Sequence, residues 1–208
     1  MAFDKKTWND EKGNIDYYVA GTGRPLLFLH SAGGPRIRKP LEGLAQRHKV
    51  YVPVMPGYDE TPLFDEVNTL PALARLMGEF ADEIVGEDCD LMGESFGGWV
   101  ALWLAVERPE LVDQIVLVAP AGLRPDDKGG LSDDAEELQR QLYRYPEKIP
   151  EDAPPPDPEA RRRRLAHYTG LDAAMDSELQ GRLGEIEQLT LVLLGEMDTI
   201  IPKETGWL

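Results

Sequence analysis

The chain has 208 residues, 42% of them hydrophobic, which suits one domain with a sizeable core. Asp and Glu total 38 against 22 Lys and Arg, so the formal net charge is −16. An acidic chain is repelled by phosphate backbones and anionic lipids, which argues against nucleic acid and membrane surfaces as partners.

The N-terminus and the single cysteine bear on the compartment. Residues 1–6 have no apolar core of the kind found in secretory signal peptides. No apolar run approaches the ~18 residues that a transmembrane helix needs. Cys89 has no partner for a disulfide within the chain and falls in an apolar run, where we expect a small buried side chain. We therefore expect a cytoplasmic protein.

The first elements predict a hairpin followed by parallel strands. Residues 8–20 are rich in strand formers around a turn at 11–14. Residues 26–29 form a continuous apolar run, as expected of a central strand buried on both faces. Helical spacing at 38–48 precedes another strand at 50–55. The alternation indicates an α/β protein.

A glycine-containing loop at 30–35, His-Ser-Ala-Gly-Gly-Pro, follows the first buried strand. Loops beyond the carboxyl ends of parallel strands are where such folds bind ligands. We expect the backbone N–H of Ala32 (or Gly33) to donate to an oxyanion, with Gly33 and Gly34 near the substrate. His30 could act as a base, but the stronger expectation is that it pins the loop by hydrogen bonds, and we count it with Gly33 and Gly34 among the substrate-binding residues.

A capped helix and a second strand–helix pair come next. Thr69 is placed to cap a helix whose apolar residues recur at helical spacing up to Ile84. A strand is expected at 89–92, a helix at 96–107 and another strand at 111–118. We interpret the helical apolar stripes as core packing.

The junction between strand 89–92 and the next helix carries the pattern Gly-x-Ser-x-Gly. Gly93 and Gly97 flank Ser95, and the missing Cβ atoms allow a strained turn that lifts the hydroxyl above the sheet. The N–H of Phe96 then lies at a helix N-terminus, where it can donate to a developing oxyanion. The pattern is typical of a nucleophile elbow, with Glu94 beside the substrate. A structural serine in a glycine-rich turn is the alternative.

The character of the chain changes after residues 119–122, which should help to line the pocket. We interpret 123–188 as a lid over the carboxyl ends of the strands, with a helix at 133–145 and a proline-rich, acidic stretch at 147–159 that is unlikely to be helical. The four arginines at 161–164 begin another helix. They could meet an anionic ligand, but a solvated helix face is the preferred interpretation.

The last apolar run, at 189–194, is of the buried-strand type. Asp198, just beyond its carboxyl end, is our candidate for an acid that orients a catalytic imidazole, and Glu196 is a weaker candidate. His167 is expected to be structural or pocket-lining. No metal-ligand cluster is visible, and no cofactor is expected.

These motifs, in this order, resemble the serine hydrolases of the α/β-hydrolase superfamily, from the first hairpin to Pro202. The resemblance implies a mostly parallel central sheet flanked by helices, with core segments 1–122 and 189–208 and a helical lid at 123–188. It also implies Ser95 as nucleophile, Asp198 as orienting acid, and Phe96 and Ala32 as oxyanion donors.

The chain departs from that family at its histidines. In the family, the triad histidine follows the acid, after one more helix and strand, whereas His30, His48 and His167 all precede Asp198. We favour a fragment that lacks the last helix and strand, which would leave strand 189–194 unpaired along one side. A complementing chain, or a natural short form that recruits His167 or has no catalysis, are the alternatives.

The expected substrate is a small, largely uncharged ester, thioester or related acyl compound, hydrolysed through an acyl-enzyme at Ser95. A serine nucleophile leaves esterase, carbon–carbon bond hydrolase, thioesterase and perhydrolase chemistry open. The alternative function is a non-catalytic binding or interaction protein on a truncated hydrolase scaffold. A homo-oligomer also remains open.

Overall fold

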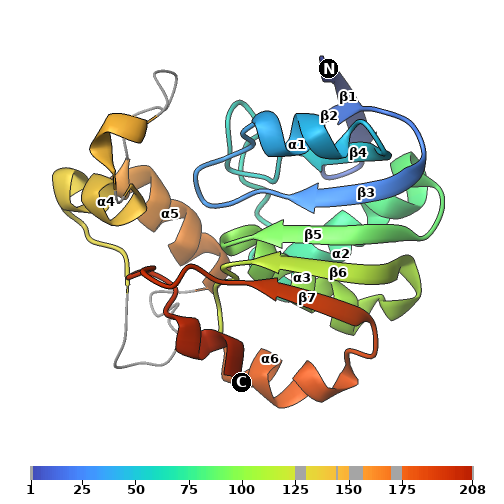
Figure 1. The fold of residues 1–208 in the computed structure, drawn as a ribbon. Helices are drawn as coiled ribbons and strands as arrows, with labels where there is room; N and C mark the ends of the chain where they lie inside the picture. Colours follow the sequence, from blue (N-terminus) through green and yellow to red (C-terminus); the bar gives the residue numbers. More distant parts are fainter. Residues whose placement is uncertain (1, 125–129, 144, 150–156, 170–174, 208) are drawn as a thin grey trace.

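The computed structural model describes residues 2–124, 130–143, 145–149, 157–169 and 175–207 (Figure 1). Its sheet has seven strands in the order β1-β2-β4-β3-β5-β6-β7. The β1/β2 and β2/β4 pairs are antiparallel, and the remaining neighbours are parallel. The strands are β1 (Asp4–Asp10), β2 (Gly13–Ala20), β3 (Arg24–Leu29), β4 (His48–Pro53), β5 (Cys89–Glu94), β6 (Val112–Val118) and β7 (Leu189–Leu193). The fold is thus α/β with a mixed, mostly parallel sheet, as predicted.

Helices cover both faces of this sheet. The α-helices are α1 (Lys39–Leu44), α2 (Leu70–Phe80), α3 (Phe96–Glu107), α4 (Ala135–Leu142), α5 (Pro158–Thr169) and α6 (Ser177–Arg182). Shorter turns are a π-helix η1 (Ala81–Val85) and the 3-10 helices η2 (Pro109–Leu111), η3 (Pro146–Lys148), η4 (Leu183–Glu185) and η5 (Lys203–Trp207). A small cluster of buried side chains joins α1 to one face. The main core lies between the other face and α2, α3 and α6.

Local sequence signals account for several helix limits. The Thr69 hydroxyl accepts a hydrogen bond from the Ala72 N–H at 3.2 Å, as its predicted capping role requires. Apolar spacing then buries one side of α2, and the helix continues through η1 to Gly86, whose φ of 78° ends it. The predicted limits of α3, 96–107, are confirmed.

Three elements differ from expectation. The first helix is only Lys39–Leu44, because His48 already begins β4. The stretch predicted to be non-helical contains η3 and the start of α5 at Pro158, since proline is tolerated in the first turn of a helix; its residues 150–156 lie outside the described part. The third difference is the exposure of β7: its apolar sequence is of the buried-strand type, but all five residues are exposed. Its place at the end of the sheet agrees with the expected unpaired side.

The segment predicted as a lid falls into two parts. Helices α4 and α5 lie beyond the carboxyl ends of the parallel strands (Figure 1). Helix α6, the last helix of the segment in sequence, lies beside the core instead. Asp176, which precedes α6, accepts hydrogen bonds at 2.8 Å from the indole N–H groups of both Trp99 and Trp103 on α3. Helix α6 is therefore tied to the core rather than to α4 and α5.

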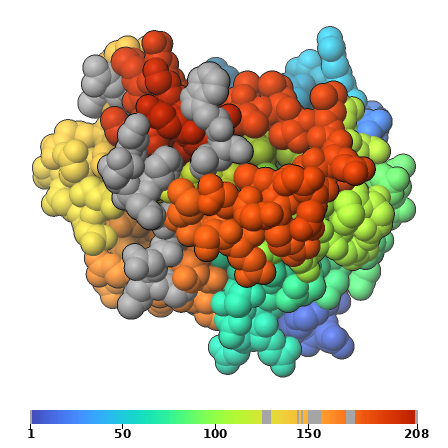
Figure 2. All heavy atoms as spheres, turned by 90° about the horizontal axis from the view of Figure 1, so that it is seen from below, coloured from blue at the N-terminus to red at the C-terminus, as the bar shows by residue number. Residues whose placement is uncertain are grey.

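Residues 175–207, orange to red in Figure 2, make up much of the face seen from below. This face includes the edge of the sheet, where Leu189 is 74% exposed. Among the helices that the structure describes, none combines the length and the apolar character needed to cross a membrane.

Candidate active site

Ser95 occupies the sharp turn between β5 and α3. Its backbone has φ 52° and ψ −114°, a strained conformation for a residue other than glycine. The Ser95 N–H donates to the Val118 carbonyl at 2.9 Å, and its own carbonyl accepts from the N–H groups of Gly98 and Ala121, each at 2.9 Å. These bonds to β6, α3 and the loop after β6 hold the turn in place. The predicted elbow geometry is confirmed.

The flanking glycines are required by close packing of the backbone. A Cβ on Gly93 would lie 2.4 Å from the Gly97 carbonyl oxygen, and a Cβ on Gly97 would lie 2.0 Å from that of Leu29. Real Cβ atoms do not approach carbonyl oxygens so closely. Helix α3 can therefore start directly against β3 and β5 only because both positions lack a side chain.

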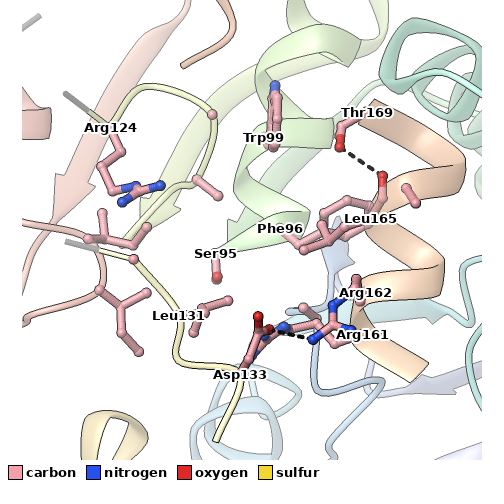
Figure 3. Close-up of a pocket in the computed structure, with 17 residues that line it drawn as sticks. Ser95, Phe96, Trp99, Arg124, Leu131, Asp133, Arg161, Arg162, Leu165 and Thr169 are labelled. Carbon is pink, nitrogen blue, oxygen red and sulfur yellow. Dashed lines mark hydrogen bonds and ion pairs between the residues drawn. The ribbon is translucent and has the colours of Figure 1, made fainter. Parts of the chain in front are cut away.

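The Ser95 side chain faces a cavity of about 360 Å³ between the strand ends and the lid helices (Figure 3). Loops after four parallel strands contribute to its wall, as expected of ligand sites beyond the carboxyl ends of strands. The lining residues are Ala32, Ser95, Phe96, Trp99, Ala121, Gly122, Arg124, Gly130, Leu131, Asp133, Arg161, Arg162, Leu165, Ala166, Thr169, Ile200 and Ile201.

Both residues predicted to donate to an oxyanion lie beside Ser95 in this wall. Phe96 is the first residue of the twelve-residue helix α3, so its N–H is one of those without a partner inside the helix. Of the two candidates in the loop after β3, Ala32 lines the cavity, and Gly33 does not. The Gly33 N–H instead points toward Ser31 Oγ at 3.4 Å. The placement favours Ala32.

His30 is buried, and its hydrogen bonds fix the loop after β3, which was the stronger expectation from the sequence. Its Nε2 accepts from the Met55 N–H at 3.1 Å, so Nδ1 carries the proton and donates to the Ser31 carbonyl at 2.8 Å. Burial lowers the pKa of His30 to about 4, and the Ser31 bond opposes that shift only in part. The side chain is 1% exposed and does not line the cavity. It is therefore neutral and positions a loop without facing Ser95.

All three histidines lie in the described part of the chain, and none lines the cavity. His48 begins β4, with Nδ1 3.4 Å from the Leu44 carbonyl at the end of α1. His167 on α5 directs Nε2 toward the carbonyl oxygens of Phe64 and Val67, at 3.2 and 3.0 Å. Nε2 is thus engaged with backbone carbonyls, and His167 does not line the cavity, so the structure does not support His167 as a recruited base.

Asp198 lies in the loop after β7, at the expected strand end. Its Oδ1 accepts from the N–H groups of Ile200 and Ile201, at 2.8 and 2.9 Å. These two residues line the cavity, so Asp198 shapes the loop that carries them. Glu196, the weaker candidate, is exposed.

The remaining predicted substrate contacts lie outside the cavity wall. Gly33 is exposed, and Gly34 is buried in a turn closed by its N–H to the Ser31 carbonyl at 3.0 Å. The Glu94 side chain is exposed at the end of β5, although the surrounding protein hinders its solvation and so raises the pKa of its carboxyl, an effect that Arg38 opposes. Gly33 and Gly34 therefore do not line the cavity with Ser95, and neither does Glu94, although it precedes Ser95 in the chain.

The arginines of α5 do not form the solvated face that the charge pattern suggested. Arg161 is buried, and both Arg161 and Arg162 line the cavity. Arg164 lies 4.5 Å over the Tyr58 ring and 3.5 Å from the Ala32 carbonyl. Arg163 alone is exposed away from the cavity wall. Four consecutive charges point around a helix rather than along one side of it, which the run of identical letters obscures.

Sequence analysis also missed most of the part of the cavity wall that α5 contributes. Arg161, Leu165 and Thr169 recur every four residues, with Arg162 and Ala166 beside them. That spacing was the available signal. No group of three or more His, Cys, Asp or Glu side chains is placed to hold a metal ion anywhere in the described ranges.

Comparisons with known proteins bear on the family and the fold. A model of the alpha/beta hydrolase family matches residues 26–206. A 2-hydroxymuconate semialdehyde hydrolase from Pseudomonas sp. (strain CF600) is 35% identical over 112 residues, 50% of this chain and 39% of that protein. A pimeloyl-[acyl-carrier protein] methyl ester esterase from Aeromonas hydrophila is 35% identical over 117 residues, 54% of this chain and 44% of that protein. The matched region thus spans less than half the length of these relatives.

The fold has a counterpart among solved structures. The 2-hydroxy-6-oxo-6-phenylhexa-2,4-dienoate hydrolase from Rhodococcus sp. strain RHA1 superposes with a TM-score of 0.79, covering 99% of this chain and 85% of that one at 23% identity. At this identity the likeness concerns the fold alone.

Proposed function

Because the chain belongs to the alpha/beta hydrolase family, we propose that it is a serine hydrolase that cleaves small ester, thioester or related acyl substrates. The observation that carries this proposal is Ser95, held in a strained elbow with its side chain in a cavity that Ala32 and Phe96 also line. The two relatives named above are a hydrolase and an esterase, which supports hydrolysis without selecting a substrate. The single buried cysteine suits a cytoplasmic location.

In the proposed reaction, Ser95 Oγ bonds to the substrate carbonyl carbon while its proton passes to a base. The N–H groups of Ala32 and Phe96 stabilise the negative charge that develops on the carbonyl oxygen. The intermediate collapses, the bond to the leaving group breaks, and the base returns the proton to that group. Water then attacks the acyl-enzyme by the same route and releases the acid and free Ser95.

We place the base outside these 208 residues, on a continuation of the chain or on a second chain, with Asp198 as the group that orients it. The support is that His30, His48 and His167 are each held by backbone atoms away from the cavity. Without such a base, Ser95 is an ordinary alcohol, and loss of one triad member typically costs roughly 10⁴-fold or more in rate.

The absence of a histidine from the described cavity wall also favours a second candidate, a binding protein on a hydrolase scaffold. A cavity of about 360 Å³ is large enough to hold a small ligand whether or not the serine is activated. In that case Ser95 would serve as a hydrogen-bonding group in the wall.

Labelling with a fluorophosphonate probe separates the two candidates. The 208-residue chain and its Ser95→Ala variant are treated, and adducts are read by intact mass and peptide mapping. Ser177→Ala is the matched control, since Ser177 lies on the exposed side of α6. One adduct on Ser95, kept in Ser177→Ala and lost in Ser95→Ala, supports the hydrolase. Imidazole in the buffer supplies the base that the proposal places outside these 208 residues. A folded chain that takes up no probe under these conditions favours the binding protein.

A further inference from the structure

We propose that the cavity beside Ser95 takes an acyl substrate that carries a carboxylate group, recognised by Arg162 together with Arg161. The inference rests on the proposed function, because it assumes that the acyl carbon reacts at Ser95. It replaces the expectation of a largely uncharged substrate with a defined chemical class.

The charge of the cavity wall is opposite to that of the protein. The chain has 38 acidic and 22 basic residues, yet the charged side chains among the described lining residues are Arg124, Arg161, Arg162 and Asp133. Figure 3 shows Arg124 on one side of Ser95 and the Arg161–Arg162 pair with Asp133 on the other. A positively charged, partly enclosed wall in an acidic protein concentrates anions at that one place.

Asp133, the acidic side chain among the described lining residues, forms ion pairs with both Arg161 and Arg162. Arg161 and Arg162 both reach Asp133 Oδ1, at 3.0 and 3.1 Å. The Arg161 side chain is only 10% exposed and gains one further bond, to the Ser132 carbonyl at 3.1 Å. Burial lowers the pKa of Arg161, and Asp133 opposes this only in part. Two guanidinium groups on one carboxylate oxygen leave hydrogen-bond donors for a second carboxylate, which guanidinium binds in a bidentate manner.

Position on the helix assigns the contact to Arg162. Its side chain is 59% exposed, so it lies at the mouth of the cavity and can turn to a ligand without disturbing the core. Arg161 stays fixed behind it. Leu131, Leu165 and Phe96 supply apolar wall in the same cavity. A short hydrocarbon chain on this surface would link the reacting carbonyl at Ser95 to the carboxylate at Arg162.

The test uses two fluorophosphonate probes of equal chain length, one ending in a carboxylate and the other in a neutral carboxamide. Their rates of Ser95 labelling, with imidazole in the buffer as the base, are compared in the wild type, Arg162→Gln and Arg163→Gln. The last two variants lose the same charge from adjacent residues, but only Arg162 lines the cavity. We expect the wild type and Arg163→Gln to react about tenfold faster with the carboxylate probe, and Arg162→Gln to lose that preference.

Equal rates for the two probes in the wild type would overturn the inference and leave Ser95 as the nucleophile. An equal loss of preference in both variants would also overturn it, because general charge would then explain the effect. Binding to Ser95→Ala, measured by calorimetry with glutarate against glutaramide, gives a readout independent of reactivity. Selective binding of glutarate, lost in Arg162→Gln, would uphold the carboxylate site even if neither probe labelled Ser95. Absence of that selectivity would count against the site.

Discussion

His167 Nε2 lies 3.0 Å from the carbonyl oxygen of Val67. The bond fastens the lid helix α5 to the loop before α2, and the same nitrogen is 3.2 Å from the Phe64 carbonyl. The imidazole therefore holds the lid on the core with the nitrogen that a catalytic base would need to keep free.

We expect His167→Leu to lower the free energy of unfolding by about 1–3 kcal/mol, because two carbonyl groups lose their donor. His167→Gln keeps an N–H group and should lose less. Urea unfolding measures both variants. Fluorophosphonate labelling of Ser95 per folded molecule should match the wild type in each. A variant of normal stability that no longer labels would identify His167 as the base after all.

The buried His30 predicts a dependence of stability on pH. Its pKa of about 4 in the folded protein lies below the ordinary 6.5, so between these values the unfolded chain binds a proton that the folded protein excludes. The free energy of unfolding should therefore fall as the pH drops from about 6.5 to 4, by about 3 kcal/mol from this group.

Urea unfolding at a series of pH values checks this dependence in the wild type and in His30→Gln. The variant is less stable at neutral pH, since the bond to the Met55 N–H must be remade, but its curve should be flatter over this range. Parallel curves for the two proteins would show that the loss of stability in acid has another source.

The elbow glycine Gly97 and the helix glycine Gly181 should respond oppositely to alanine. Gly97→Ala places a Cβ 2.0 Å from the Leu29 carbonyl oxygen, which forces α3 away from β3 and should cost more than about 4 kcal/mol. Gly181 lies on the exposed side of α6, where an added Cβ would meet nothing within 4 Å. Gly181→Ala should therefore raise the free energy of unfolding by about 0.5–1 kcal/mol. Thermal unfolding of the two variants compares them directly, and a tolerated Gly97→Ala would refute the close-packing argument.

The edge strand β7 predicts self-association of the 208-residue chain. Leu189, Leu191 and Leu193 are 74%, 54% and 46% exposed beside an unpaired backbone edge, which can pair with a strand of a second copy. Leu191→Lys should shift sedimentation velocity toward the monomer. Leu142→Lys, at a 49% exposed leucine on α4, is the control and should not. Equal effects of the two lysines would point to general stickiness instead of strand pairing.

Much of the core could be predicted from local sequence patterns. The apolar strands, the Thr69 cap and the Gly-x-Ser-x-Gly turn each depend on residues that are close together in the chain. The elbow could be placed from sequence since only glycine fits at Gly93 and Gly97. Where the imidazoles point depends on partners distant in sequence, such as Met55 for His30 and Val67 for His167. No local pattern encodes those partners.

The cavity wall was decided by tertiary structure. The four residues at 161–164 are all arginine, yet their side chains have different surroundings. In chain order, the first is buried, the second lies at the cavity mouth, the third is exposed away from the cavity and the fourth lies over the Tyr58 ring. Helical rotation separates them by direction, and the docking of α5 over the strand ends determines what each direction meets. The sequence by itself thus determined the fold family and the nucleophile turn, while the packing of the lid decided the charge and chemistry around Ser95.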